Sequence, residues 1–236
     1  MESSWALFNV EGLLFLLRWG HFLFGIMWIG ILWYFNFVQG PFMAEVDATV
    51  KTAVNQKLAP RNLWFFRWGA MGTFLTGWTI ILIRFAQAGP EGAALATSKW
   101  GVTILTGALM GSLMWFNVWF VIWPRMKKVV AAANGEKIDN VPILARRAFL
   151  ASRTNTLISI PMLFFMASAS HLAIAVEPGK VMTWFCLIIV LLGLAEVNAL
   201  KADKGPTIKP IEKVSGVIQM GLLLTIVLYV LAEVIL

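Results

Sequence analysis

The sequence predicts an all-α integral membrane protein, a single-domain bundle of about six transmembrane helices over residues 1–236. Hydrophobic residues make up 59% of the chain and charged residues only 13%, about half the charged share that is usual in soluble domains. The mean hydropathy is +0.78. The 12 Trp and 17 Phe are typical of lipid-facing helices with aromatic anchors at the membrane interfaces. We therefore expect membrane lipid to cover most of the surface.

Six segments are long and apolar enough to span a bilayer as helices, which takes roughly 20 residues. Most of the prolines fall between these segments, where the missing N–H does least harm, and Pro161 is expected to kink the fourth helix. The predicted helices cover residues 12–38, 63–86, 100–123, 154–176, 181–200 and 214–236.

The basic residues predict the orientation of the bundle. Most of the 19 Lys and Arg fall in the first, third and fifth loops, whereas the second and fourth loops hold one each, Lys99 and Lys180. The positive-inside rule then places the odd loops in the cytoplasm and both termini outside. The first residues carry no Lys or Arg, so we expect no signal peptide and a first helix that stays in the membrane. Because the net charge of +7 is spread over these loops, we expect no nucleic-acid partner.

The only two histidines, His21 and His171, both lie in predicted helices, about nine and five residues from the outer ends. At 1.5 Å per residue their depths are ~13 Å and ~8 Å, so both belong to the outer half of the bilayer. Two imidazoles at similar depth on different helices can hold a haem iron from opposite sides. The sequence therefore predicts haem b with His21 and His171 as axial ligands. The alternative, that each histidine only hydrogen-bonds a neighbouring helix, stays open.

Several neighbours suit such a site. Gly25 would let a flat macrocycle approach the backbone, and Trp28 lies one turn further on the His21 face. Arg18, one turn before His21, and Arg84, near the outer end of the second helix, are candidates to neutralise a haem propionate or an anionic substrate. Either arginine could instead extend to the interface. The single Cys186 excludes a disulfide and a Cys-x-x-Cys-His haem attachment.

A second polar layer is expected near the inner helix ends. Glu196 and Arg67 lie at a similar depth in this layer and could pair. The layer also contains one asparagine on each of four helices: Asn36, Asn117, Asn155 and Asn198. An inter-helix hydrogen-bond network is the simpler interpretation, and a proton entry route from the cytoplasm is the alternative.

Several motifs resemble one known family. They include Gly20-His21-Phe22-Leu23-Phe24-Gly25, Phe66-Arg67-Trp68-Gly69-Ala70, Trp123-Pro124-Arg125-Met126, Ser152-Arg153-Thr154-Asn155-Thr156 and the stretch from Ile160-Pro161-Met162 to Ser170-His171. Together they resemble the N-terminal membrane domain of bacterial cytochrome-c-linked urate oxidases. The resemblance extends over essentially the whole chain, which departs from the longer members in lacking the C-terminal cytochrome c domain.

The resemblance implies a bacterial inner-membrane oxidoreductase that converts urate to 5-hydroxyisourate and passes electrons to a periplasmic cytochrome c. Arg18, Trp28 and Arg84 would then be the catalytic candidates, and His21, His171, Arg18 and Gly25 would bind haem b. Two alternatives stay open: a non-catalytic electron-transfer or assembly subunit of a larger complex, and a small transporter. An oligomer is compatible with all three.

Overall fold

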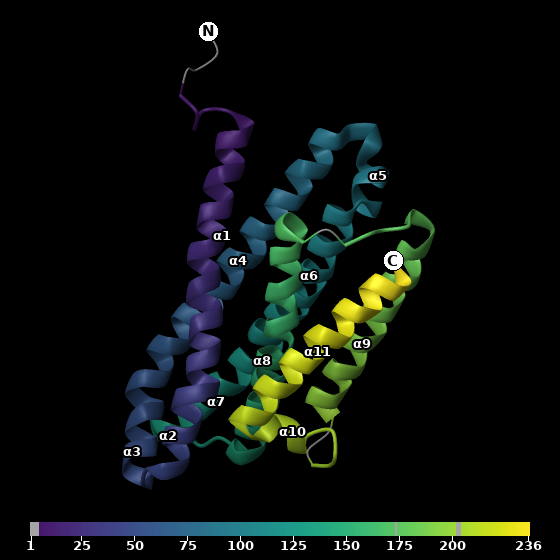
Figure 1. Ribbon diagram of the computed structural model, residues 1–236. Helices are drawn as coiled ribbons and strands as arrows, with labels where there is room; N and C mark the ends of the chain where they lie inside the picture. Colours follow the sequence, from purple (N-terminus) through teal and green to yellow (C-terminus); the bar gives the residue numbers. More distant parts are fainter. Residues whose placement is uncertain (1–4, 173, 202–203) are drawn as a thin grey trace.

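A computed structural model describes residues 5–172, 174–201 and 204–236, and this part of the chain contains helices and no strand (Figure 1). The long helices are α1 (Val10–Trp33), α4 (Ala59–Ala88), α6 (Lys99–Phe116), α8 (Val141–His171), α9 (Val181–Lys201) and α11 (Val214–Ile235). Shorter helices connect them: α2 (Gly40–Glu45), α3 (Ala48–Ala53), α5 (Gly92–Thr97), α7 (Trp123–Ala133) and α10 (Lys209–Glu212). Two 3₁₀ turns, η3 (Gly89–Glu91) and η5 (Pro178–Lys180), complete the loops.

The structure confirms the predicted membrane bundle. Six helical segments are long and apolar enough to cross a membrane, and they are Val10–Glu45, Ala48–Thr97, Lys99–Ala133, Val141–His171, Pro178–Lys201 and Val214–Ile235. The segments extend beyond the predicted bounds at several inner ends, and the fourth begins 13 residues earlier than expected, at Val141 rather than at residue 154.

Three helices continue through a proline that the sequence suggested would lie between helices. A π-helical turn comes directly before each one: η1 (Tyr34–Gln39) before Pro41, η2 (Val54–Leu58) before Pro60 and η4 (Asn117–Ile122) before Pro124. In each case the proline is the second residue of the next α-helix. Proline has no N–H and its ring clashes with the carbonyl four residues back, so the preceding turn widens to the i→i+5 pattern. The helices therefore run on into the inner end of the bundle.

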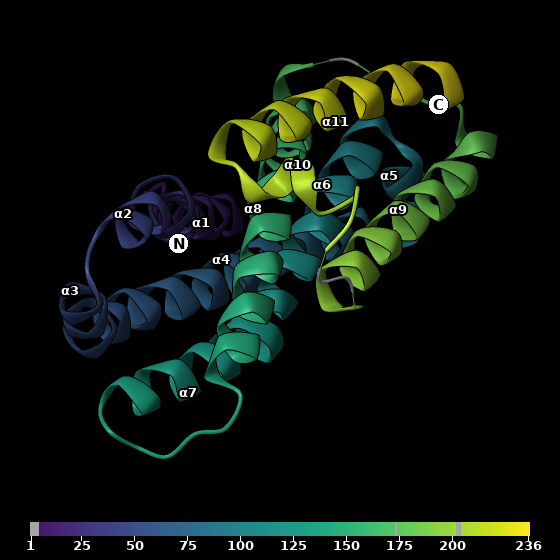
Figure 2. The same ribbon diagram turned by 90° about the horizontal axis from the view of Figure 1, so that it is seen from below.

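Helix α8 lies at the centre, in contact with α1, α6, α7, α9, α10 and α11 (Figure 2). It carries a buried polar run that includes Thr154, Asn155, Thr156 and Ser159. Thr156 and Ser159 donate to carbonyls one turn back, at 2.9 and 2.7 Å, which satisfies their hydroxyls within the helix. A polar face on the central helix can therefore be buried at little cost.

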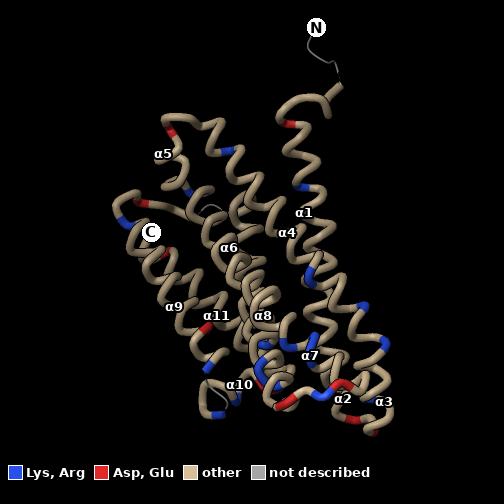
Figure 3. The backbone as a smooth tube through the Cα atoms, turned by 180° about the vertical axis from the view of Figure 1, so that it is seen from behind, with Lys and Arg blue, Asp and Glu red and all other residues tan. Residues whose placement is uncertain are grey.

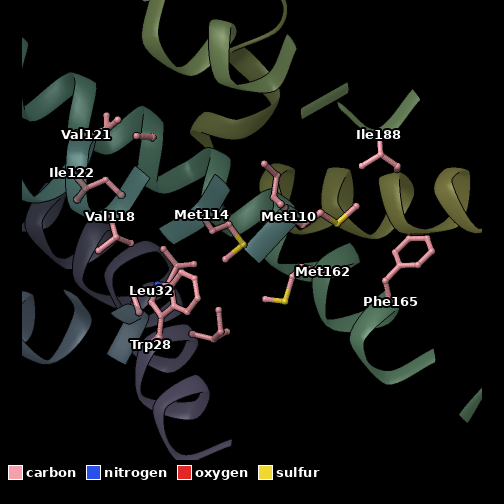
Figure 4. Packing of buried hydrophobic residues seen from close by; sticks show 14 of the residues in the cluster. Trp28, Leu32, Met110, Met114, Val118, Val121, Ile122, Met162, Phe165 and Ile188 are labelled. Carbon is pink, nitrogen blue, oxygen red and sulfur yellow. The ribbon is translucent and has the colours of Figure 1, made fainter. Parts of the chain in front are cut away.

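The core fills the space between α1, α6, α8 and α9. Large apolar side chains from all four helices meet there, among them Trp28, Met114, Phe165 and Ile188 (Figure 4). Flexible methionines pack between the aromatic rings, where they fill irregular gaps.

Many of the charged residues lie at one end of the bundle, where α2, α3, α7 and α10 lie, while the start of α1 and the end of α11 lie toward the other end (Figures 1 and 3). Three basic residues depart from the predicted loop. Arg146, Arg147 and Arg153 precede the predicted helix start at residue 154 but lie within α8, where Arg153 is 3% exposed. The sequence pattern missed them because α8 begins well before its apolar stretch.

Helices α1 and α4 pack closely at glycine. A Cβ atom added at Gly69 would lie 3.1 Å from the backbone nitrogen of Trp28 and 3.3 Å from the backbone carbonyl oxygen of Phe24. We expect Gly69→Leu to destabilise the bundle by about 1–3 kcal/mol, because backbone atoms cannot move aside without separating the helices. Reversible unfolding in mixed micelles would measure the loss. Gly30→Leu on α1 is the control, because a Cβ there meets nothing within 4 Å, and an equal loss in both variants would contradict the prediction.

Candidate functional site

His21 lies on the face of α1 that packs against α4, with its ring partly buried. Its Nδ1 atom lies 3.2 Å from the Thr76 hydroxyl, and a Cβ at Gly77 would lie 2.9 Å from the ring carbon Cε1. Glycine at position 77 therefore makes room for the imidazole against the backbone of α4.

The Thr76 hydroxyl is placed to accept from the His21 ring. Its own proton has two carbonyl acceptors, Gly72 at 2.6 Å and Thr73 at 3.2 Å, which leaves its oxygen free to accept from Nδ1. With the proton of a neutral imidazole on Nδ1, Nε2 would keep its lone pair. A hydrogen bond on one ring nitrogen that leaves the other free is the arrangement metal-binding histidines use.

Space beside His21 also suits a flat ligand. A Cβ at Gly25 would meet nothing within 4 Å, and one at Gly20 would meet only the Thr76 methyl group at 3.8 Å. The small residues beside His21 leave room for a flat ligand there, and haem at this position stays a prediction.

His171 is the last residue of α8, and its side chain is exposed. Within the described residues no hydrogen bond joins it to His21, whose contacts are with α4. These residues also contain no group of three or more His, Cys, Asp or Glu that could hold a metal ion. The pairing of the two histidines across one haem stays a prediction.

The two arginines have different surroundings. Arg18 is exposed on α1, one turn before His21. Arg84 on α4 instead forms a two-pronged ion pair with Glu11, with Nη1–Oε1 and Nη2–Oε2 both 3.2 Å. Since Glu11 is 62% exposed, this pair adds little stability, but it ties the start of α1 to α4. Of the two, Arg18 is therefore the arginine that has no carboxylate partner among the described residues.

Trp28, the third catalytic candidate, lies in the hydrophobic core and is 1% exposed. Its indole nitrogen is buried without a hydrogen-bond partner. A buried N–H without a partner is costly, and the role of Trp28 in a ligand site stays a prediction.

The inner polar layer forms a specific cluster, which we call the Asn–Glu cluster: Asn117, Asn155 and Glu196, on η4, α8 and α9. The Asn117 amide donates to Asn155 Oδ1 at 3.0 Å and to Glu196 Oε2 at 2.9 Å. Asn155 donates in turn to the Met114 carbonyl at 2.9 Å. Two acceptors in the cluster, Asn117 Oδ1 and Glu196 Oε1, are buried without a partner. The predicted inter-helix network is thus confirmed for these three residues.

The other members of the layer lie apart from this cluster. Asn36 donates to Ser152 at 2.8 Å, which joins η1 to α8, and Asn198 accepts from Thr207 at 2.7 Å. The suggested Arg67–Glu196 pair is wrong, since among the described residues the Arg67 guanidinium lies over the Trp123 ring, 4.0 Å from its centroid. The sequence could not predict which partner Arg67 contacts, because the rotation of each helix about its own axis determines which side chains face each other.

Comparison with known proteins gives one finding. A family profile described as urate oxidase N-terminal matches residues 92–230. The matched segment contains His171 and the whole Asn–Glu cluster, but it begins after α4 and so does not include His21. No curated protein and no solved structure matches the chain at a significant level.

Proposed function

Because this chain belongs to the urate oxidase N-terminal family, we propose that it is a membrane oxidoreductase that oxidises urate to 5-hydroxyisourate. The observation that carries the proposal is the family match over residues 92–230, more than half of the chain. We further propose that the electrons pass to a cytochrome c and that the protein resides in the bacterial inner membrane. The basic end of the bundle would then face the cytoplasm and both termini the periplasm.

The proposed cofactor is haem b in the outer half of the bundle. His21 would supply one axial ligand through Nε2, with Thr76 orienting the ring, and His171 would supply the other. Bound haem would accept and release single electrons. Among the described residues no hydrogen bond or ion pair holds the His171 side chain, so in this proposal haem binding would position it.

Arg18 is the proposed partner for negative charge. Urate is an anion at neutral pH, and a guanidinium can bind an anionic oxygen by paired, charge-assisted hydrogen bonds. Arg84 is engaged by Glu11, so we assign it to holding α1 against α4 rather than to the anion. Trp28 closes the inner side of this region with an indole N–H that still lacks an acceptor.

Optical spectra of the purified, detergent-solubilised protein test the proposal. We expect b-type bands after reduction with dithionite, the same bands after reduction with urate, and urate-dependent reduction of added cytochrome c. A colourless protein from cells well supplied with haem would overturn the haem assignment. A haem protein that urate does not reduce would overturn the substrate.

A further inference from the structure

A groove of about 520 Å³ lies between α4, α6 and α9, away from the His21 region. Its walls include Phe74 and Trp78 from α4, Leu113 and Trp115 from α6, and Ile189 from α9. Phe74 and Trp115 stack with their ring centroids 4.2 Å apart, and the Trp78 indole donates to Ser112 at 3.0 Å. The polar atom of Trp78 is therefore satisfied, whereas the Trp115 indole N–H is buried without a partner among the described residues. The volume of the groove is within the range of small-molecule sites.

The groove ends at the Asn–Glu cluster. Glu196 lines it, and only one of its carboxyl oxygens, Oε2, has a hydrogen-bond partner. Asn117 is fully buried, yet its Oδ1 has no donor either. The cluster therefore contains two acceptor atoms, Asn117 Oδ1 and Glu196 Oε1, that have no donor among the described residues. The last torsion of a Glu side chain is broad, so the carboxyl group can turn its unpaired oxygen toward the groove.

The location of the groove restricts what can fill it. From Glu196 to Ile189 it follows α9 for seven residues, ~10 Å along the helix, into the apolar part of the span. An anion such as urate would lose its hydration there and face a carboxyl group, which is unfavourable. A phospholipid acyl chain would fill the walls but would leave Glu196 Oε1, the unpaired acceptor that lines the groove, without a donor. A neutral, membrane-soluble ring that carries an O–H donor fills the walls and pairs this acceptor.

We propose that this groove binds the headgroup of an isoprenoid quinol. A quinol hydroxyl donates to Glu196, the ring packs against the aromatic wall formed with Trp115, and the tail leaves along α9 into the bilayer. Both the quinol and the quinone can accept from the Trp115 indole N–H, but only the quinol has a hydroxyl that can donate to Glu196 Oε1, which favours the quinol. This inference requires neither urate nor haem.

Calorimetric titration of the detergent-solubilised protein with decylubiquinol tests the proposal. We expect saturable one-to-one binding, tighter than that of decylubiquinone. Gly193→Leu places a side chain in the groove, and since a Cβ there meets nothing within 4 Å, the fold should survive. The variant should bind decylubiquinol roughly tenfold or more weakly, which titration resolves easily. Gly30→Leu, equally free of contacts on α1, should bind as the wild type does.

Two further measurements separate this proposal from plain lipid binding. Glu196→Gln should remove the preference for quinol over quinone, whereas Glu233→Gln, on the exposed face of α11, should leave it unchanged. Equal binding by Gly193→Leu and wild type would overturn the site. Displacement of the quinol by decanol at equal concentration would also overturn it, because the groove would then recognise only an alkyl chain.

Discussion

His21→Ala is expected to yield a folded protein without bound haem and with urate oxidation reduced to background. The variant removes the nitrogen proposed as an iron ligand, and alanine leaves a gap against Thr76 and Gly77 rather than a clash. Reduced-minus-oxidised spectra measure the haem, and a colorimetric assay of cytochrome c reduction measures turnover. Retention of the full b-type spectrum would contradict the assignment of His21.

Thr76→Val gives a sharper test of the same site. If the Thr76 hydroxyl holds the His21 tautomer, its loss should lower haem affinity roughly 10- to 100-fold, as loss of a second-layer hydrogen bond does at other metal sites. Thr79→Val, on the exposed surface one turn along α4, is the matched control and should leave haem affinity unchanged. Similar haem affinity in the two variants would show that Thr76 does not position the ligand.

The number of membrane-spanning helices could be predicted from the sequence because it depends on local composition. An apolar run of about 20 residues is long enough to span the bilayer, and a helix satisfies its backbone hydrogen bonds within the segment. The helix ends were harder to predict. Pro41, Pro60 and Pro124 suggested helix ends, but a single π turn before each proline lets the helix continue. A rule that treats proline as a terminator cannot distinguish a break from a widened turn.

The candidate site could be predicted only in part, for a different physical reason. Depth follows from counting residues, so the Asn–Glu cluster was correctly expected to form one layer. The contacts within a layer depend on how each helix rotates about its axis, which is set by packing over the whole bundle. That is why Arg67 was suggested as the partner of Glu196 but lies over Trp123, and why the Thr76 contact of His21 had no sequence signal.

Asn117→Leu should be among the most destabilising single substitutions in the bundle. It removes both hydrogen bonds that the Asn117 amide donates, and it leaves Asn155 Oδ1 and Glu196 Oε2 buried without a donor. We expect a loss of about 2–3 kcal/mol in the free energy of unfolding, because the cost of leaving two acceptors without a donor adds to the loss of two hydrogen bonds. Unfolding in mixed micelles would measure it, with Asn198→Leu, near the inner end of α9, as the control.

The triple variant Asn117→Leu, Asn155→Leu and Glu196→Leu separates hydrogen bonding from packing. When every partner is replaced by an apolar side chain, no acceptor is stranded, so the triple variant should be more stable than Asn117→Leu alone. If the cluster served only to fill space, the destabilising effects of the three substitutions would add, and the triple variant would be the least stable. The sign of the difference in stability between the triple and the single variant therefore shows whether unpaired acceptors or lost packing dominate the cost of Asn117→Leu. A triple variant as stable as the wild type that no longer binds decylubiquinol would assign the cluster to ligand binding.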